Sequence, residues 1–161
     1  MNFRFLVVAT FAICSWFQTS VAGQCALDAQ TFGRTCRVTI YDAILHYNYR
    51  PSSPAGFCGL SMIILGQPQV PGYRRETAWL VVGFRQTQFQ VPCCNACTLS
   101  VEPVAILNEI AFGAFDGLNI PPSAIGLTAY FQGVQLWWVS QPPNPEVPII
   151  EATAGLALTF R

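Results

Sequence analysis

The sequence has 161 residues, of which 52% are hydrophobic and only 10% are charged. Its 8 basic residues, all Arg, balance its 8 acidic residues, so the formal net charge is zero. Because no basic stripe is present to neutralise phosphates, we expect the chain not to bind nucleic acid. Apolar side chains must also cover part of the folded surface, which predicts a surface prone to association, a partner or a neighbouring layer in an assembly.

The first segment, residues 1–22, is predicted to be a secretory signal peptide. Arg4 supplies its positive charge, Phe5–Phe17 is an apolar run, and Ser20-Val21-Ala22 gives the small residues that precede a cleavage site. Cleavage would leave one exported domain, residues 23–161. The apolar run is too short to span a bilayer, so we expect no membrane span after cleavage. The expected location is extracellular, either secreted or at the cell surface.

Of the seven cysteines, one leaves with the signal peptide, and the remaining six suit a disulfide framework in an oxidising compartment. They are Cys25, Cys36, Cys58, Cys93, Cys94 and Cys97. The preferred hypothesis is a local Cys25–Cys36 bond, with Cys58 bonded to one of the 93–97 cluster and the other two closing a tight loop. A zinc or redox centre is the less favoured alternative, because export selects oxidised thiols. We therefore expect no metal and no cofactor.

Most of the mature chain has strand patterns, because two-residue alternation and β-branched or aromatic runs recur between Pro and Gly turns. The expected strands are 35–41, 43–49, 60–65, 78–91, 98–102, 126–139 and 155–161. Residues 126–139 are expected to form either a strand pair or one long strand bent at Gly133. Residues 104–115 are ambiguous, and irregular or short-helical structure is favoured there over a strand pair. Residues 141–148 are expected to form a proline-rich loop.

The last strand carries the most specific structural prediction. Leu156, Leu158 and Phe160 share one parity, and Thr159 has the other. A strand so near the end of the chain is stable only if its apolar face is locked into the core. We therefore expect it to pair antiparallel with residues 127–131.

Short strands separated by frequent turns predict an all-β fold. The favoured architecture is a disulfide-stabilised antiparallel β-sandwich of the immunoglobulin-like or Greek-key type, and a barrel is the less favoured alternative. No internal repeat or linker divides residues 23–161, which predicts a single domain.

Motifs in the second half of the chain follow one another in a recognisable order. They are Cys97–Pro103, Phe112–Gly117, Leu118–Pro121, Gly126–Gly133 and Thr153–Phe160. This order resembles a C-terminal β-sandwich module of secreted proteins from planctomycete-type bacteria, over roughly residues 58–161. The resemblance implies a β-sandwich fold and an extracellular setting, and it brings no catalytic residues.

A hydrolytic site lacks a convincing set of residues. His46, the single histidine, would need a nucleophile and an orienting carboxylate, but neither Ser61 nor Ser100 lies in a Gly-x-Ser-x-Gly elbow. Glu102 and Glu109 are the nearest carboxylate pair for glycoside hydrolysis, but solvation and pairing with Arg are the favoured interpretation. We expect no catalytic residues and no enzyme activity.

Aromatic side chains are the better functional hint. Tyr47 and Tyr49 share one strand parity, whereas Trp137 and Trp138 face opposite sides of a strand, so one of the two tryptophans is expected in the core. The favoured hypothesis is a secreted, non-catalytic structural or adhesive protein that acts through its sandwich surface on an extracellular protein or polysaccharide. A carbohydrate-binding module that stacks these rings on sugars is the alternative, and a hydrolase is the least favoured.

Overall fold

The structure is a computed structural model that describes residues 25–36, 43–51, 57–65, 71–91, 97–140 and 143–161. The predicted signal peptide, most of the predicted strand 35–41, and Cys93 and Cys94 lie outside the described residues. The strands in chain order are β1 (Leu27–Phe32), β2 (Ile44–Pro51), β3 (Cys58–Leu65), β4 (Tyr73–Gly83), β5 (Gln86–Gln90), β6 (Thr98–Val101), β7 (Ala105–Asn108), β8 (Ala114–Ile120), β9 (Thr128–Val139), β10 (Val147–Ala152) and β11 (Gly155–Phe160), with one 3-10 turn, η1 (Pro122–Ala124), before β9. Their ladders are all antiparallel, which confirms the predicted all-β antiparallel fold.

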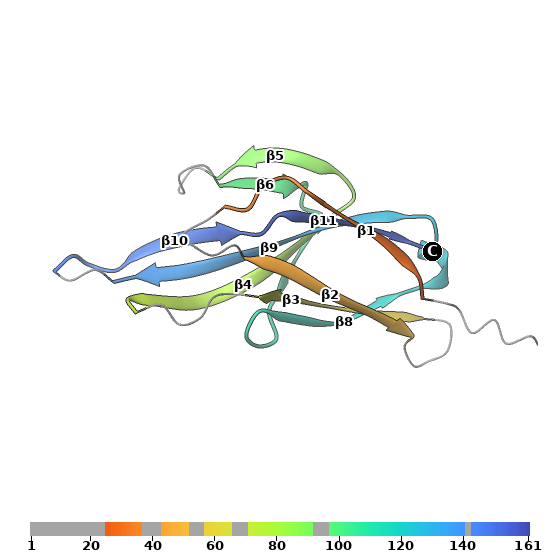
Figure 1. Ribbon diagram of the computed structural model, residues 1–161, viewed down its shortest axis with the longest axis horizontal. Helices are drawn as coiled ribbons and strands as arrows, with labels where there is room; N and C mark the ends of the chain where they lie inside the picture. Colours follow the sequence, from red (N-terminus) through yellow and green to blue (C-terminus); the bar gives the residue numbers. More distant parts are fainter. Residues whose placement is uncertain (1–24, 37–42, 52–56, 66–70, 92–96, 141–142) are drawn as a thin grey trace, which may run out of the picture.

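The strands form three layers (Figure 1). The central sheet has the strand order β1-β11-β9-β4-β7, and β10 pairs with the second half of β9. The three-stranded sheet, β2-β3-β8, covers one face of the central sheet, and the two-stranded sheet, β5-β6, packs on the other face. The expected sandwich-like arrangement is present, with a third layer that the sequence patterns did not predict.

The larger core lies between the central sheet and the three-stranded sheet. Leu60, Met62 and Ile64 occupy alternate positions of β3 and are fully buried. They belong to the same cluster as Leu80 of β4 and Leu158 of β11. Alternation therefore turns one face of β3 inward and leaves the intervening positions facing outward.

Gly133 brings the two sheets of this core close together. β9 runs through Gly133 as one continuous strand. A Cβ at this position would lie 2.6 Å from the Cδ1 atom of Ile64, closer than side-chain carbons can approach. The missing side chain therefore makes room for Ile64 of β3.

The C-terminal strand forms as predicted. β11 pairs antiparallel with β9, from Leu156 opposite Phe131 to Thr159 opposite Thr128. Leu156, Leu158 and Phe160 are buried, whereas Thr159 is only half-buried. The predicted pairing and the predicted inward face are both confirmed.

A second interface joins the central sheet to the two-stranded sheet. Val81 of β4 and Val134 of β9 pack in one cluster with Cys97 and with Val101 of β6. The central strands are thus covered on both faces over this length. This cover explains why residues 79–82 of β4 form a continuous apolar run instead of alternating.

Three predicted segments have different structures from those expected. The long strand predicted over 78–91 is two strands, because the chain leaves the central sheet after Gly83 and enters the two-stranded sheet as β5. A Cβ at Gly83 would lie 2.0 Å from the carbonyl oxygen of Glu102, so this crossing requires glycine. Residues 104–115 are not irregular or helical but contain β7 and the start of β8, held by pairing with β4 and β3. The predicted 141–148 loop ends early, since β10 begins at Val147 alongside β9.

The disulfide pairing differs from the preferred hypothesis. Cys25 is bonded to Cys58 and Cys36 to Cys97, with Cα–Cα distances of 5.7 and 4.9 Å. The local Cys25–Cys36 bond is wrong because β1 runs between these residues as an extended strand, about 20 Å long. The first bond ties the β1 side of the central sheet to the three-stranded sheet, and the second ties the central sheet to the start of the two-stranded sheet.

Candidate functional site

The four aromatic side chains considered for sugar stacking do not share one surface. Tyr47 and Tyr49 lie on the inner face of β2, half-buried against the larger core. The ring centroid of Tyr49 lies 5.9 Å from that of Phe160. Burial raises the pKa of Tyr49 above its ordinary value, as expected for a phenol that is partly withdrawn from water.

The two tryptophans lie on opposite faces of β9, as the alternation of a strand requires. Trp137 is buried and its Nε1 donates a hydrogen bond to Oε2 of Glu151 at 3.1 Å, whereas Trp138 is half-buried. Trp137 is therefore the core tryptophan. The exposed row of rings that sugar stacking would require is not formed by these tryptophans together with the tyrosines of β2.

The side chains that a hydrolase would need are not linked by hydrogen bonds in the part of the chain that the structure describes. His46 is exposed on the outer face of β2, and Ser61 and Asp116 lie on the other two strands of that sheet. Among the residues described, no hydrogen bond links these three side chains. Glu102 and Glu109 lie beyond opposite ends of β7, so they do not face each other across one substrate.

Within the described ranges, β7 forms an open edge of the central sheet, because β4 is the one strand that it pairs with there. Four large apolar side chains are exposed along β7 and its flanking residues, and we call them the apolar edge: Val104, Ile106, Ile110 and Phe112. Phe112 is 86% exposed and has a backbone φ of 49°, which a non-glycine residue adopts rarely. No charged residue lies within 104–108, whereas protected edges usually carry charge.

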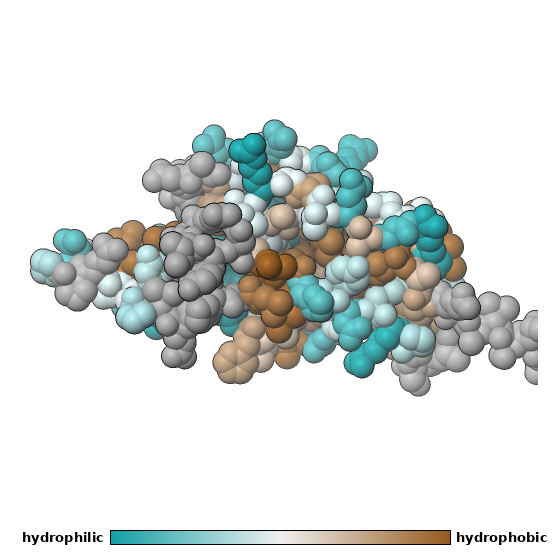
Figure 2. Space-filling view, in the orientation of Figure 1, coloured by the Kyte–Doolittle hydropathy of each residue, from teal (hydrophilic) through white to brown (hydrophobic). Residues whose placement is uncertain are grey.

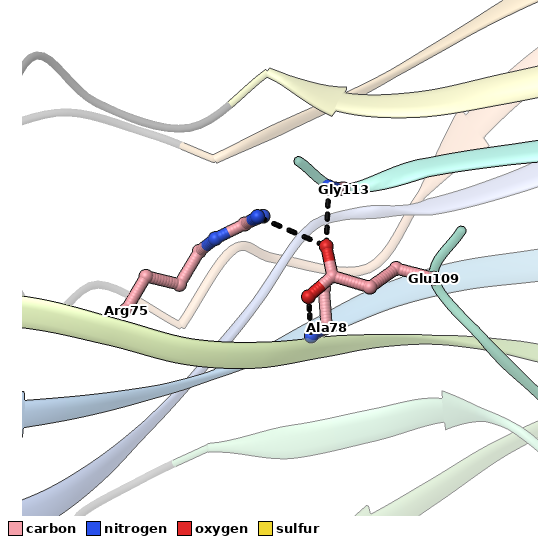
Figure 3. Close-up of polar contacts among 4 residues, drawn as sticks. All are labelled: Arg75, Ala78, Glu109 and Gly113. Carbon is pink, nitrogen blue, oxygen red and sulfur yellow. Dashed lines mark hydrogen bonds and ion pairs between the residues drawn. The ribbon is translucent and has the colours of Figure 1, made fainter. Parts of the chain in front are cut away.

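Glu109 fixes the turn between β7 and β8 (Figure 3). Its Oε1 accepts a hydrogen bond from the backbone N–H of Ala78 at 3.0 Å, and its Oε2 accepts one from the backbone N–H of Gly113. The same Oε2 lies 2.9 Å from Nη2 of Arg75, and both side chains of this ion pair are largely withdrawn from solvent. Glu109 therefore has a structural role, and it holds the turn that presents the last two residues of the apolar edge.

The apolar edge continues onto the end of the three-stranded sheet. Ile44 and Leu65 are opposite each other on β2 and β3, and both are exposed. The backbone N–H of Ile64 donates to the carbonyl oxygen of Gly113 at 2.9 Å, which places the β7–β8 turn beside them. Figure 2 shows apolar surface over the start of β2 and the loop before β8. Contiguous exposed apolar surface marks interaction sites on soluble proteins.

The outer face of the three-stranded sheet has an apolar end and a polar end. From the polar end, its cross-strand rows are Arg50–Gly59–Asn119, Asn48–Ser61, His46–Ile63–Ala114 and Ile44–Leu65. Asp116 and Gly117 lie where the register between β3 and β8 shifts. A hollow of about 610 Å³ opens at the polar end, and its lining includes Arg50, Ser61, Asp116 and Asn119.

Comparisons with protein-family models, curated proteins and solved structures found no match for this chain. The resemblance to the planctomycete-type module therefore stays a prediction. Within the described ranges, no helix is long and apolar enough to cross a membrane. Over the same ranges, no group of three or more His, Cys, Asp or Glu side chains is placed to hold a metal ion.

Sequence reasoning did not single out either the apolar edge or the hollow. Large apolar residues at the even-numbered positions Val104, Ile106 and Ile110 indicate one face of a strand. The expectation of irregular structure over 104–115 does not use this pattern. The hollow has a weaker signal in the outward polar positions of β2. Its other wall, from Asp116 onward, joins those positions only through the pairing of β3 with β8.

Proposed function

We propose that the protein is a secreted, non-catalytic structural or adhesive component that associates through the apolar edge. The observation that carries the proposal is an open sheet edge with large exposed apolar side chains and no charge within residues 104–108. Disulfide bonds that tie the central sheet to each outer layer are compatible with an oxidising extracellular setting. The occupant proposed for the edge is a second copy of this chain.

Backbone geometry supports pairing between two β7 strands. The backbone N–H of Glu109 donates to the carbonyl oxygen of Ala78. By the register of the ladder, the backbone groups of the odd-numbered residues, Ala105 and Leu107, therefore bond to β4. Ile106 and Asn108 therefore turn their N–H and C=O groups toward the open side, because alternate residues of an antiparallel strand bond in opposite directions. An antiparallel pair of identical strands about a two-fold axis is self-complementary.

Charge also favours self-association. The formal net charge of the sequence is zero, so two copies experience little long-range repulsion. β7 is only four residues long, which limits the number of new hydrogen bonds. Most of the binding free energy must then come from burying the apolar edge, at about 25 cal/mol per Å² of apolar surface.

Sedimentation of the mature protein over a range of concentrations tests the proposal. We expect the wild type to form dimers or larger assemblies. Ile106→Lys places a charge on the open edge and should weaken association at least about tenfold, which corresponds to about 1.4 kcal/mol. The matched control is Ile125→Lys, because Ile125 is as exposed as Ile106 but lies beside η1, away from β7.

Three outcomes would count against association through this edge. The first is a wild type that stays monomeric at its highest soluble concentration. The second is an Ile106→Lys variant that assembles as strongly as the wild type, and the third is an equal loss in the Ile125→Lys control. Circular dichroism of each variant must match that of the wild type, so that loss of assembly is not loss of fold.

A further inference from the structure

We propose that the polar hollow on the outer face of the three-stranded sheet binds neutral sugar chains. Its volume of about 610 Å³ lies within the range of ligand sites, about 300–1,000 Å³. The residues in its lining do not belong to the apolar edge, so this site and the proposed self-association rest on separate observations.

The hollow exists because its floor lacks large side chains. Gly59 and Ser61 are the outward residues of β3 at this end, between β2 on one side and β8 on the other. Gly117 has a φ of 80°, a left-handed conformation that favours glycine. A Cβ at Gly117 would meet nothing within 4 Å, so this residue borders open space.

Two oppositely charged side chains on the walls of the hollow have no partner among the residues that the structure describes. Arg50 extends from β2 and Asp116 from β8, and both are exposed. Neither forms an ion pair or a side-chain hydrogen bond with any residue that the structure describes. By contrast, the exposed arginines Arg74 and Arg161 pair with carboxylates. The two charges at the hollow are therefore available to a ligand.

The combination of hydrogen-bonding groups matches a polyhydroxylated ligand. The Arg50 guanidinium only donates, the Asp116 carboxylate only accepts, and the Ser61 hydroxyl does both. Sugar hydroxyl groups also donate and accept, so one neutral chain can satisfy all three. An anionic ligand would be repelled by the carboxylate, and a cationic ligand by the guanidinium.

The width and surroundings of the hollow suit a sugar chain. β2 and β8 lie on either side of β3, so their backbones are about 10 Å apart. A sugar chain can lie across the sheet over that width. The next row, His46–Ile63–Ala114, adds an imidazole ring and apolar side chains against which the C–H faces of sugars can pack.

The test is binding of the folded protein to an array of neutral, sialylated and sulfated glycans, followed by calorimetric titration with the neutral glycan that binds best. We expect binding to neutral glycans. Arg50→Ala and Asp116→Asn should each weaken that binding about tenfold or more, since each removes a charge-assisted hydrogen bond. Ser61→Phe should abolish it, because the ring would fill the floor of the hollow.

Controls separate a specific site from a general effect of charge. Arg85→Ala and Glu102→Gln each remove one exposed charge from residues outside the lining of the hollow. Both controls should bind as the wild type does, with unchanged unfolding midpoints. The proposal is overturned if the wild type binds no glycan, if it binds acidic glycans only, or if binding survives both Arg50→Ala and Asp116→Asn. None of these results depends on the oligomeric state, so they leave the proposed function to its own test.

Discussion

The two faces of the central sheet hold their outer layers by different interactions. Toward the three-stranded sheet the contact is a broad apolar core in which Leu60, Met62 and Leu158 are almost completely buried. Each outer layer has one disulfide to the central sheet, but toward the two-stranded sheet the apolar cluster is smaller, and buried polar groups supplement it. The comparison shows that a layer with enough buried apolar area needs few specific bonds, whereas a two-stranded layer is only marginally stable without them.

Gln132 is the main polar link to the small layer. Its Oε1 accepts a hydrogen bond from the backbone N–H of Ser100 at 2.8 Å. Its Nε2 donates to the carbonyl oxygens of Thr98 at 3.2 Å and Thr153 at 2.9 Å. One fully buried side chain thus joins β9, the turn before β11 and β6.

The largest expected effect is in the apolar core. Leu158→Ala should lower the free energy of unfolding by about 2–5 kcal/mol, because it removes a fully buried side chain and leaves a cavity. Urea unfolding followed by circular dichroism measures this loss.

The control for Leu158 is its neighbour on the other face of β11. Thr159→Ala removes one hydrogen bond, between the hydroxyls of Thr128 and Thr159 at 2.8 Å, and should lower the free energy of unfolding by about 1 kcal/mol. A Thr159→Ala loss as large as that of Leu158→Ala would mean that the core is not on the side of β11 described here.

The next effect distinguishes the two disulfides. Replacing both Cys36 and Cys97 with Ala should lower the free energy of unfolding by about 2–4 kcal/mol. Because this bond supports the small layer, we expect amide hydrogen exchange to rise first in β5 and β6, before global unfolding. Replacing both Cys25 and Cys58 with Ala should instead leave exchange in β5 and β6 unchanged under native conditions. Equal exchange in these strands for both double variants would contradict the proposed difference between the layers.

Strands with a single buried face could be predicted from the sequence, and strands that depend on a partner layer could not. β11 alternates over 155–160, and an apolar run predicts a strand over 60–65; the structure has both strands, with β3 beginning two residues earlier, at Cys58. β4 has an unbroken apolar run whose end is set by the crossing at Gly83, and that crossing depends on the position of Glu102. Local periodicity contains no information about a carbonyl oxygen nineteen residues away.

The candidate sites were hidden for the same reason. Arg50 and Asp116 are distant in sequence and reach one hollow only through two strand pairings, both of which include β3. The disulfide pairing likewise depends on the extended path of β1, which carries Cys36 away from Cys25 and toward the small layer. Residue types could indicate that six cysteines would be oxidised, but only the strand order determines which of them meet.

The last comparison is between two glutamines on opposite faces of β9, and its expected effects are smaller than those in the apolar core and at the disulfide. Gln132 and Gln135 are both fully buried, but neither amide atom of Gln135 has a hydrogen-bond partner within the described ranges. Gln132→Met should lower the free energy of unfolding by about 1–3 kcal/mol, because it leaves the backbone N–H of Ser100 buried and unpaired. Gln135→Met keeps a similar volume and removes a buried polar group without a partner, so it should be neutral or stabilise the protein by up to about 1 kcal/mol. Urea unfolding of the two variants gives the comparison, and hydrogen exchange at Ser100 should rise only in Gln132→Met. Equal losses in the two variants would contradict the comparison. They would mean that the hydrogen bonds of Gln132 to the two-stranded sheet stabilise the protein no more than the Gln135 amide does.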